Sequence, residues 1–390
     1  MKKQIEKTSK KEEKLEKKPK SSKKSKSLRK SESLTQEYEK DVSKEPKKRK
    51  RKPVSSDSLI PSGCTVFNLK CSDRIEGAFQ LGKYHNVIGD SSSGKTILCL
   101  HLLAECANDK RFDEYRLIKS DCEQADEFDI KFMFGKKTAK RIEHWEDQAP
   151  ETVEEFSDQI NKLLEEDKPF IYILDSLDSL TSKAEVEKEE KNRKKREKGT
   201  KEEGSYDTDK QKYMSKFFRT TRKKLNKHNS AVIIISQTRD NIGFGAFLNP
   251  KSRSGGRALK FYSCIEVWGS VGKKEKEGQY TTLTETAWKI TKNKTTGRHA
   301  TCYFNIIQDY GIDDIGACIR FLIEEGSWSA SSKASINVKN FANIEKNISY
   351  KELVKKIEKD NLEDDLRNLC QIEYNKILEK IAPERKQRYE

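Results

Sequence analysis

The sequence predicts an α/β fold with a mostly parallel central sheet, and three observations support this prediction. Short apolar runs of β type alternate with helical stretches, which is typical of parallel strands joined by crossover helices. Two of these runs, Phe170–Leu174 and Ala231–Ile235, are unbroken, as in strands covered on both faces. A glycine-bounded loop at residues 89–96 joins another run to a helix. The folded part is therefore expected to be a P-loop domain.

The first segment of this 390-residue chain has a different composition from the rest. Its first 60 residues hold 22 Lys and Arg against 10 Asp and Glu, with few apolar side chains. Such a segment cannot bury enough apolar surface to offset its ordering entropy, so residues 1–58 are expected to be a disordered basic tail. The cluster Pro46–Pro53 leaves three interpretations open: a nucleic-acid-binding arm, a plain solvated linker or a nuclear import signal.

The expected elements follow in chain order from about residue 59. Tyr84–Ile88, Arg116–Lys119 and the two unbroken runs are inner strands. Cys264–Trp268 and Ala287–Ile290 are expected as an antiparallel continuation of the sheet. Past Phe321 the pattern changes to short amphipathic helices, of which Tyr350–Lys359 and Leu362–Leu378 are the best candidates. We therefore divide the folded part into a core at residues 59–328 and a small, mainly helical module at residues 329–390.

Two stretches interrupt the core and are expected to be mobile. Residues 183–203 contain nine Lys and Arg and seven Asp and Glu, too many charges for a core segment, and we extend this charged insertion to residue 212. Residues 241–260 contain four glycines. Both stretches follow the carboxyl ends of inner strands, where ligand sites collect in open α/β sheets.

The loop at residues 89–96 fits the pattern G-x-x-x-x-G-K-[ST], reading Gly89-Asp90-Ser91-Ser92-Ser93-Gly94-Lys95-Thr96. In this pattern, backbone N–H groups surround a β-phosphate and the helix N-terminus adds partial positive charge. Lys95 is expected to reach the β and γ oxygens, and the Thr96 hydroxyl to ligate Mg²⁺. The strand before the loop and the apolar helix after it make a chance serine-rich turn a poor explanation, so the chain is expected to bind a nucleoside triphosphate with Mg²⁺.

Three polar residues follow inner strands and would complete a nucleotide site. Asp175 ends the run Phe170–Leu174 and would hold Mg²⁺ through its water shell, or would only cap a turn. Glu123 follows the second strand, where a carboxylate would orient the attacking water. Gln237 follows Ala231–Ile235 and would bond the γ-phosphate and report its loss to the glycine-rich loop, or would be an ordinary strand-end polar residue.

The glycine-rich loop at residues 241–260 carries Lys251, Arg253 and Arg257. A mobile cationic loop whose glycines leave the backbone open can follow an irregular phosphodiester chain, so single-stranded nucleic acid is a reasonable ligand. A plain surface loop is the alternative.

Taken together and in order, these motifs resemble those of the RecA-type recombinases over residues 60–328. The resemblance covers the entry segment Ser62-Gly63-Cys64 through Thr96, the D-x-E element Asp121-Cys122-Glu123, the motif Leu174-Asp175-Ser176, the strand end Ser236-Gln237-Thr238-Arg239, the segment from Asn249-Pro250 to Gly255-Gly256-Arg257 and the helix after it, and Thr291-Lys292-Asn293-Lys294. The K-N-K element and Asn249-Pro250 favour the bacterial and phage branch.

The resemblance implies a DNA-dependent ATPase that polymerises on single-stranded DNA and exchanges strands with duplex DNA. It implies Glu123 as the catalytic base, acting with Lys95 and Gln237, and Lys292 and Lys294 as ligands of ATP on the neighbouring subunit. The second DNA-binding loop would contribute Arg253, Gly255, Gly256 and Arg257. The implied partners are DNA, further copies of the chain in a helical filament and a single-strand-binding or loader protein, with no membrane partner. The cytosol is the expected location, that of a bacterial host if the gene is phage-borne, or the nucleus if the basic cluster directs import.

The chain departs from the family in three places. The charged insertion replaces the first DNA-binding loop, the lysine-rich tail lacks a convincing polymerisation helix, and the residues around Glu127 and Ile130 do not match those that hold the adenine. Two alternatives therefore stay open: a recombinase-like accessory or loading protein with weak ATPase activity, and a hexameric helicase-like motor. A small-molecule kinase is disfavoured because nothing beyond the P-loop resembles an acceptor pocket.

Overall fold

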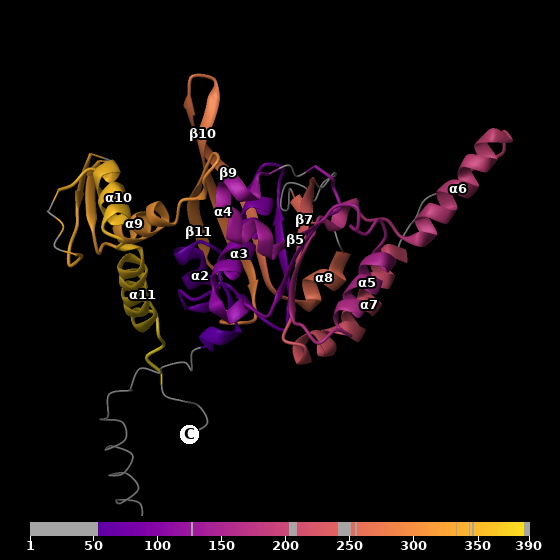
Figure 1. Ribbon diagram of the computed structural model, residues 1–390, viewed down its shortest axis with the longest axis horizontal. Coiled ribbons are helices and arrows are strands. Elements are labelled where there is room, and N and C mark those ends of the chain that lie inside the picture. The colour runs from indigo at the N-terminus through magenta and orange to yellow at the C-terminus, as the bar shows by residue number, and fades with distance from the viewer. Residues whose placement is uncertain are drawn as a thin grey trace, which may run out of the picture. The chain divides into compact units, whose positions relative to one another are not determined.

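The expected α/β architecture is present in the computed structural model of the chain (Figure 1). It describes residues 54–385 except 126–127, 203–208, 241–250, 254–255, 333, 343 and 345–346. The basic tail up to residue 53, including its cluster, and residues 241–250 of the glycine-rich loop therefore lie outside the described residues. The chain divides into a large unit, Arg51–Lys380, and a second unit formed by Met1–Lys50 with Ile381–Glu390. All elements given below belong to the large unit.

A ten-stranded sheet forms the centre of this unit, in the order β12-β11-β10-β9-β3-β7-β6-β4-β5, with β8 paired to the end of β7. Its strands are β3 (Tyr84–Gly89), β4 (Arg116–Asp121), β5 (Ile142–Trp145), β6 (Phe170–Asp175), β7 (Ala231–Asp240), β8 (Lys251–Arg253), β9 (Ser263–Glu277), β10 (Tyr280–Asn293), β11 (Thr301–Ile307) and β12 (Gly311–Ile312). The four inner strands expected from the sequence are all present.

The expectation of an antiparallel continuation was wrong for its first strand. The strand β9 pairs parallel with β3, and only β10, β11 and β12 continue the sheet antiparallel. Six neighbouring strands, from β9 to β5, are therefore parallel. Beyond the sheet, β9 and β10 continue as a long projecting hairpin (Figure 1) whose exposed residues from Ser270 onward carry mixed charges.

Alternation of side chains divides the core into two layers, one on each face of the sheet. In β6, Ile171 and Ile173 face one layer, whereas Phe170, Tyr172 and Leu174 face the other. All six residues of this strand are buried, which explains the unbroken apolar run in the sequence.

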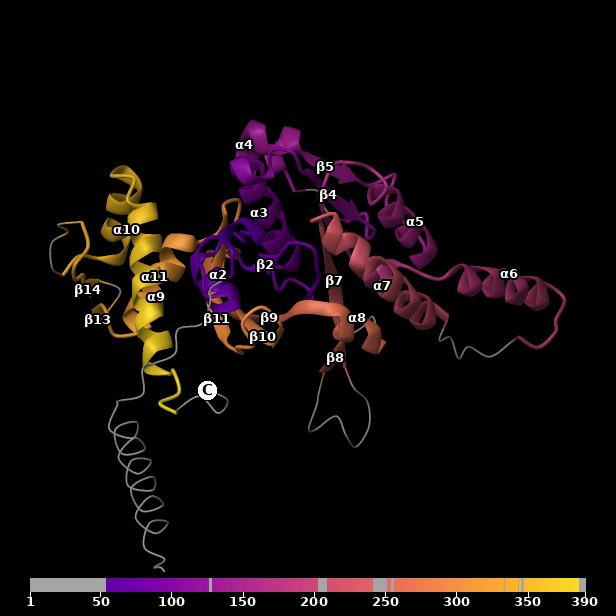
Figure 2. The same ribbon diagram turned by 90° about the horizontal axis from the view of Figure 1, so that it is seen from below.

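Helices cover both faces (Figures 1 and 2). One core layer includes side chains of α2 (Thr65–Ser72), α3 (Lys95–Asn108) and α9 (Asp314–Glu324), with α4 (Ile130–Arg141) packed beside α3. The other includes side chains of α5 (Val153–Leu163), α7 (Asp209–Lys227) and α8 (Gly256–Tyr262). The segments η1 (Ser56–Ser58), η2 (Lys110–Phe112) and η3 (Leu177–Ser179) are single 3₁₀ turns, and β1 (Leu59–Ile60) pairs with β2 (Phe79–Gln80).

The charged insertion begins with a helix, α6 (Lys183–Glu197). Ser182 starts it through a capping box: its hydroxyl accepts the Glu185 N–H, and the Glu185 carboxylate accepts the Ser182 N–H. Most of its residues are exposed, so this segment adds no layer to the core. Residues 203–208 of the insertion lie outside the described part of the chain.

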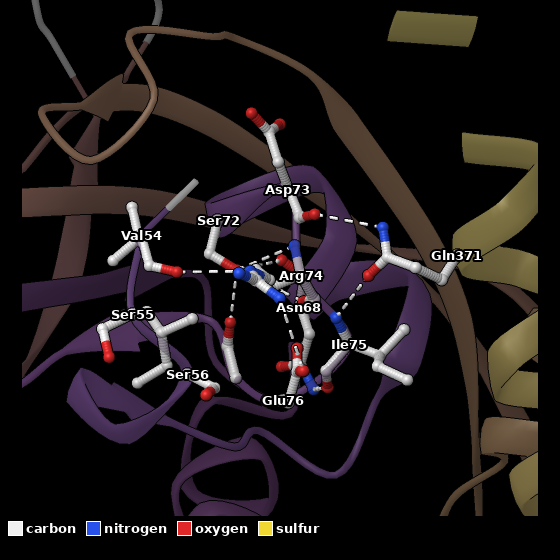
Figure 3. Close-up of polar contacts among 12 residues, drawn as sticks. Val54, Ser55, Ser56, Asn68, Ser72, Asp73, Arg74, Ile75, Glu76 and Gln371 are labelled. Atoms are coloured by element: carbon white, nitrogen blue, oxygen red, sulfur yellow. Dashed lines mark hydrogen bonds and ion pairs between the residues drawn. The ribbon is translucent and has the colours of Figure 1, made fainter. Parts of the chain in front are cut away.

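Both helices expected near the C-terminus are present, as α10 (Tyr350–Lys359) and α11 (Glu363–Lys380), beside a hairpin of β13 (Ser329–Ser332) and β14 (Ser335–Asn337) that the sequence did not reveal. Figure 3 shows how α11 contacts the core: Gln371 accepts the Ile75 N–H at 3.0 Å and donates to the Asp73 carbonyl at 3.1 Å. The Asp73 carboxylate also accepts the Tyr374 hydroxyl at 3.3 Å. The turn after α2 therefore ties α11 to the core.

Two further observations complete the description of the fold. Among the described residues, no helix is both long enough and apolar enough to cross a membrane. All nine cysteines are free, and eight of them are buried.

Candidate nucleotide site and adjoining loop base

The P-loop connects β3, in the middle of the sheet, to the first turn of α3. Gly94 has a φ of 86°, a conformation that strains residues with a Cβ, and an added Cβ would also lie 2.2 Å from Ile306 Cδ1, so glycine is favoured at this position. The Ser93 hydroxyl donates to the Asp90 carbonyl at 2.8 Å, while Ser91 and Ser92 are exposed at the tip. The loop is therefore a preformed turn with its tip open to solvent.

The Lys95 side chain folds back over this loop. Its Nζ donates to the carbonyls of Gly89 at 3.0 Å and Asp90 at 2.8 Å. Burial lowers the pKa of Lys95, and the negative charges of Asp175 and Glu123 act in the opposite direction. The ammonium is therefore held within the loop, next to two carboxylates.

Asp175, at the end of β6, faces Thr96. The Thr96 hydroxyl donates to Asp175 Oδ2 at 2.7 Å. Burial raises the pKa of Asp175 to about 6; the Thr96 hydrogen bond and the charge of Lys119 counteract this, while Glu123 adds to it. Lys119 itself is buried in β4, with its Nζ 4.0 Å from Asp121 Oδ2. This buried cation could not be predicted from the sequence pattern, because it occupies a position that is normally apolar in an inner strand.

The end of β4 positions Glu123. In the sheet register Asp121 lies opposite Asp175, and the Cys122 N–H donates to the Asp175 carbonyl at 2.6 Å. The Asp121 carboxylate then accepts the Glu123 N–H at 3.1 Å, which fixes the turn. As a result the Glu123 carboxylate accepts a hydrogen bond from the Ser176 hydroxyl, so the ends of β4 and β6 are joined at this point.

Gln237 reaches the same carboxylate from β7. Its Nε2 donates to Glu123 Oε1 at 2.8 Å, and its backbone N–H donates to Asp178 Oδ2 at 2.7 Å. The structure thus brings together Lys95, Asp175, Glu123 and Gln237 at the carboxyl ends of adjacent strands. Asp178 was missed because an acidic residue three positions past a strand end has no distinctive pattern.

Asp90 connects the P-loop to the base of the glycine-rich loop. Its carboxylate accepts the Thr238 hydroxyl of β7 and pairs with the Lys251 ammonium of β8. These two strands pair antiparallel on either side of residues 241–250, with Asp240 opposite Lys251. The bonds from Lys251 and Thr238 lower the pKa of Asp90. Two strand ends therefore hold one P-loop carboxylate.

The expected DNA-binding residues lie in different environments. Arg257 is exposed on α8. Arg253, expected to face DNA, instead pairs with Glu266 at 2.9 Å in a largely buried contact, and its guanidinium also donates to the Gly256 carbonyl at 2.9 Å. Gly256 has a φ of 68°, in the region that favours glycine. Gly255 lies outside the described residues.

Lys292 and Lys294 do not reach the P-loop of their own chain. Lys292 lies in β10 opposite Glu266, which pairs with Asn86 in the middle of β3, whereas the P-loop begins at Gly89. Both ammonium groups donate at 2.9 Å to the Phe261 carbonyl at the end of α8. Burial, with repulsion from Lys294, lowers the pKa of Lys292 to about 8. Beside them, Phe261 is 65% exposed.

The site fits a magnesium–nucleoside triphosphate complex. A hydroxyl and a buried carboxylate with a raised pKa, 2.7 Å apart, are oxygen donors suited to a hard divalent cation. The tip of the loop is open to solvent, and Lys95, which donates here to the Gly89 and Asp90 carbonyls, lies within the loop where it would turn to phosphate oxygens. In the described part of the chain, no three His, Cys, Asp or Glu side chains form a group that could hold a metal ion by themselves.

Comparison with known proteins agrees with this geometry. The family model described as the RecA N-terminal domain matches residues 35–313. The chain belongs to the RecA family. This membership makes it an ATP-binding and DNA-binding protein of recombination and repair, with a P-loop ATPase core.

The individual relatives have low sequence identity to this chain, but the alignments cover most of both chains. The RecA protein of Nitratidesulfovibrio vulgaris is 29% identical over 282 residues, covering 70% of this chain and 71% of the relative. That of Bacillus velezensis is 27% identical over 302 residues, covering 75% and 80%. That of Caldanaerobacter subterraneus is 27% identical over 338 residues, covering 84% and 88%. The RecA resemblance drawn from the motifs is confirmed.

Proposed function

We propose that this chain is an ATP-dependent DNA recombinase that forms filaments on single-stranded DNA and exchanges strands with duplex DNA, with ATP bound between neighbouring subunits. The observation that carries the proposal is the direct contact between the nucleotide site and both strands flanking the glycine-rich loop. Gln237 bonds the carboxylate expected to activate water, and Thr238 and Lys251 bond Asp90 of the P-loop. Loss of a γ-phosphate would therefore change the hydrogen bonds that hold the base of the glycine-rich loop.

Each residue has a distinct role in the proposed reaction. Lys95 binds the β and γ oxygens, and its charge stabilises the transferring phosphoryl group. Glu123, held in place by Asp121 and Ser176, orients the attacking water and accepts its proton. Bound through Thr96 and Asp175, Mg²⁺ would neutralise charge on the phosphates. Gln237 leaves Glu123 for the γ-phosphate when ATP binds, and returns after hydrolysis.

The positions of Lys292 and Lys294 support a shared site. Both lie apart from the P-loop of their own chain, beside the exposed ring of Phe261. A neighbouring copy that covered Phe261 would bring its phosphates next to these ammonium groups. Among the expected DNA contacts, Arg257 and the glycine pair Gly255–Gly256 would touch the single strand, while Arg253 holds the loop base through Glu266.

A double variant, Lys292→Ala with Lys294→Ala, tests the shared site. It should lose DNA-stimulated ATP hydrolysis while isolated subunits still bind ATP, because the P-loop is untouched. The matched control is Lys351→Ala with Lys355→Ala, two exposed lysines of α10. Normal DNA stimulation in the Lys292/Lys294 variant contradicts the proposal.

Electron microscopy with single-stranded DNA and a non-hydrolysable ATP analogue separates the alternatives. Helical filaments are the expected result. Closed rings would favour the helicase-like motor, and unassembled particles would favour an accessory protein.

A further inference from the structure

A row of lysines and arginines runs along the outer face of α7. Lys216, Arg219, Lys223 and Lys227 are spaced by three or four residues, which places them on one face of a helix. All four are exposed. We call these four residues the α7 stripe. From Lys216 to Lys227 it extends about 17 Å at the rise of an α-helix.

The opposite face of α7 explains why this helix stays folded with so much positive charge. Met214, Phe217, Phe218 and Leu225 are buried in the core layer shared with α5 and α8. This packing fixes the helix against the sheet and points the stripe outward. The sequence already showed the charges, but only the buried face establishes that four of them share one surface.

Within the part of the chain that the structure describes, acidic side chains do not pair with the stripe. Asp209, in the first turn, is the only acidic residue of α7. It pairs with Lys212, which precedes the stripe. In the described part of the chain no ion pair involves any of the four stripe residues. Arg222 and Lys224, also exposed, add to the positive potential on either side. A surface of one sign without partners favours a polyanion.

The position of the stripe separates it from the loop site. The first turn of α7 lies beside α8, where a Cβ added to Gly256 would lie 3.3 Å from Gln211 Cγ. From there α7 runs back beside β7 (Figure 2), and its last turn leads through Ser230 into the start of β7. The stripe therefore extends from the loop base toward the end of the sheet where β7 begins, away from the P-loop.

We infer that the α7 stripe binds the phosphate backbone of duplex DNA, a second DNA partner beside the strand at the glycine-rich loop; this inference rests on the proposed function. Among the described residues, no large exposed hydrophobic side chain lies on α7, so the stripe offers no ring on which an unpaired base would stack. A membrane surface is disfavoured for the same reason, since an interfacial helix needs exposed apolar groups. A straight row of cations instead matches a regular backbone.

The test replaces three lysines of the full-length chain, Lys216→Gln, Lys223→Gln and Lys227→Gln. The matched control replaces three exposed lysines of α10, Lys351→Gln, Lys355→Gln and Lys359→Gln, so that net charge and the basic tail are the same in both proteins. Binding of duplex and of single-stranded DNA is measured without nucleotide at several salt concentrations.

For duplex DNA, the slope of log K against log salt concentration should become shallower by about 2 to 3 in the α7 variant, because roughly 0.9 counterion is released per phosphate contact. Single-strand binding and basal ATP hydrolysis should change little. An unchanged duplex slope, or the same loss in the control, overturns the inference. A larger loss for the single strand than for the duplex also overturns it.

A second measurement uses the unaltered protein and so does not depend on variant folding. Duplex DNA should protect Lys216, Lys223 and Lys227 from chemical acetylation more than the three α10 lysines. Equal labelling of both sets with and without duplex would contradict the inference. Neither measurement requires filaments or ATP, so failure of the proposed function would be seen separately.

Discussion

Gln237 Nε2 lies 2.8 Å from Glu123 Oε1, although the two residues are 114 positions apart in the chain. The amide donates to the carboxylate expected to activate water, and so occupies one of the acceptor positions of that carboxylate. The same side chain belongs to the last residues of β7, the strand that leads into the glycine-rich loop. This single contact therefore ties the readiness for hydrolysis to the state of β7.

Replacing Gln237 with Ala should separate ATP binding from the stimulation of ATP hydrolysis by DNA. Without the amide, ATP still binds through Lys95 and Thr96, but stimulation of hydrolysis by single-stranded DNA should fall roughly tenfold to a hundredfold, as expected for one charge-assisted hydrogen bond. Steady-state hydrolysis with and without DNA measures the ratio. Full stimulation in this variant would show that Gln237 does not couple DNA binding to ATP hydrolysis.

Replacing Glu123 with Gln should remove the base while keeping the size of the side chain. We expect kcat to fall by about 10² to 10⁴ with nearly unchanged ATP affinity, because the P-loop contacts are intact. Glu165→Gln, an exposed carboxylate outside the site, is the control. Activity close to that of the control would show that another group orients the water.

The pair formed by Asp90 and Lys251 should carry part of the coupling between ATP and DNA. Both side chains are partly exposed, so the pair should contribute only about 0–1 kcal/mol to stability. A double-mutant cycle with Asp90→Asn and Lys251→Met is therefore measured on function, as the factor by which an ATP analogue changes single-strand affinity. Each single variant should reduce this factor, and the double variant should lower it no further. Fully additive losses would show that the two residues act independently.

Acidification should destabilise the core through His101. Burial lowers the pKa of His101 to about 4, and its Nε2 accepts the Ile312 N–H at 2.8 Å, which requires the neutral ring. The unfolded chain binds the proton at its ordinary pKa of about 6.5. The contribution to stability is therefore complete above about pH 6.5 and is lost as the pH falls toward about 4, with a total of the order of 3 kcal/mol.

Denaturant unfolding at pH 7 and pH 5 measures this effect. His101→Gln retains an acceptor that does not titrate in this range, so its free energy of unfolding should change less between the two pH values than that of the unaltered chain. Equal changes in the two proteins would assign the acid sensitivity to other groups, with the buried His85, whose pKa is also about 4, next in line.

Much of this site was predictable because its motifs are local. The P-loop, Asp175 and Glu123 each lie at a strand end that the apolar pattern marks clearly, and parallel strands bring such ends to one edge. The continuation of the sheet was less predictable: Lys273–Glu277 of β9 is too charged to read as a strand, and the parallel pairing of β9 with β3 is set by contacts distant in sequence.

The contacts that link the site to the loop could not be predicted from the sequence. Asp90 and Lys251 are 161 residues apart, and no spacing rule relates them. Arg253 illustrates the opposite error: its place in a basic, glycine-rich loop indicates DNA contact, whereas Glu266 in the next strand captures its charge. Only packing decides which cations of such a segment face solvent.

The central place of β3 has a kinetic consequence. Both of its edges are hydrogen-bonded, to β7 and to β9, so the amides leading into the P-loop should exchange with deuterium only in the rarest openings of the molecule. The three residues of β8 are bonded to β7 alone and should exchange far sooner. The nucleotide is thus expected to bind at the most rigid part of the sheet. The strand β8, which contacts the P-loop, lies where backbone hydrogen bonds open most readily.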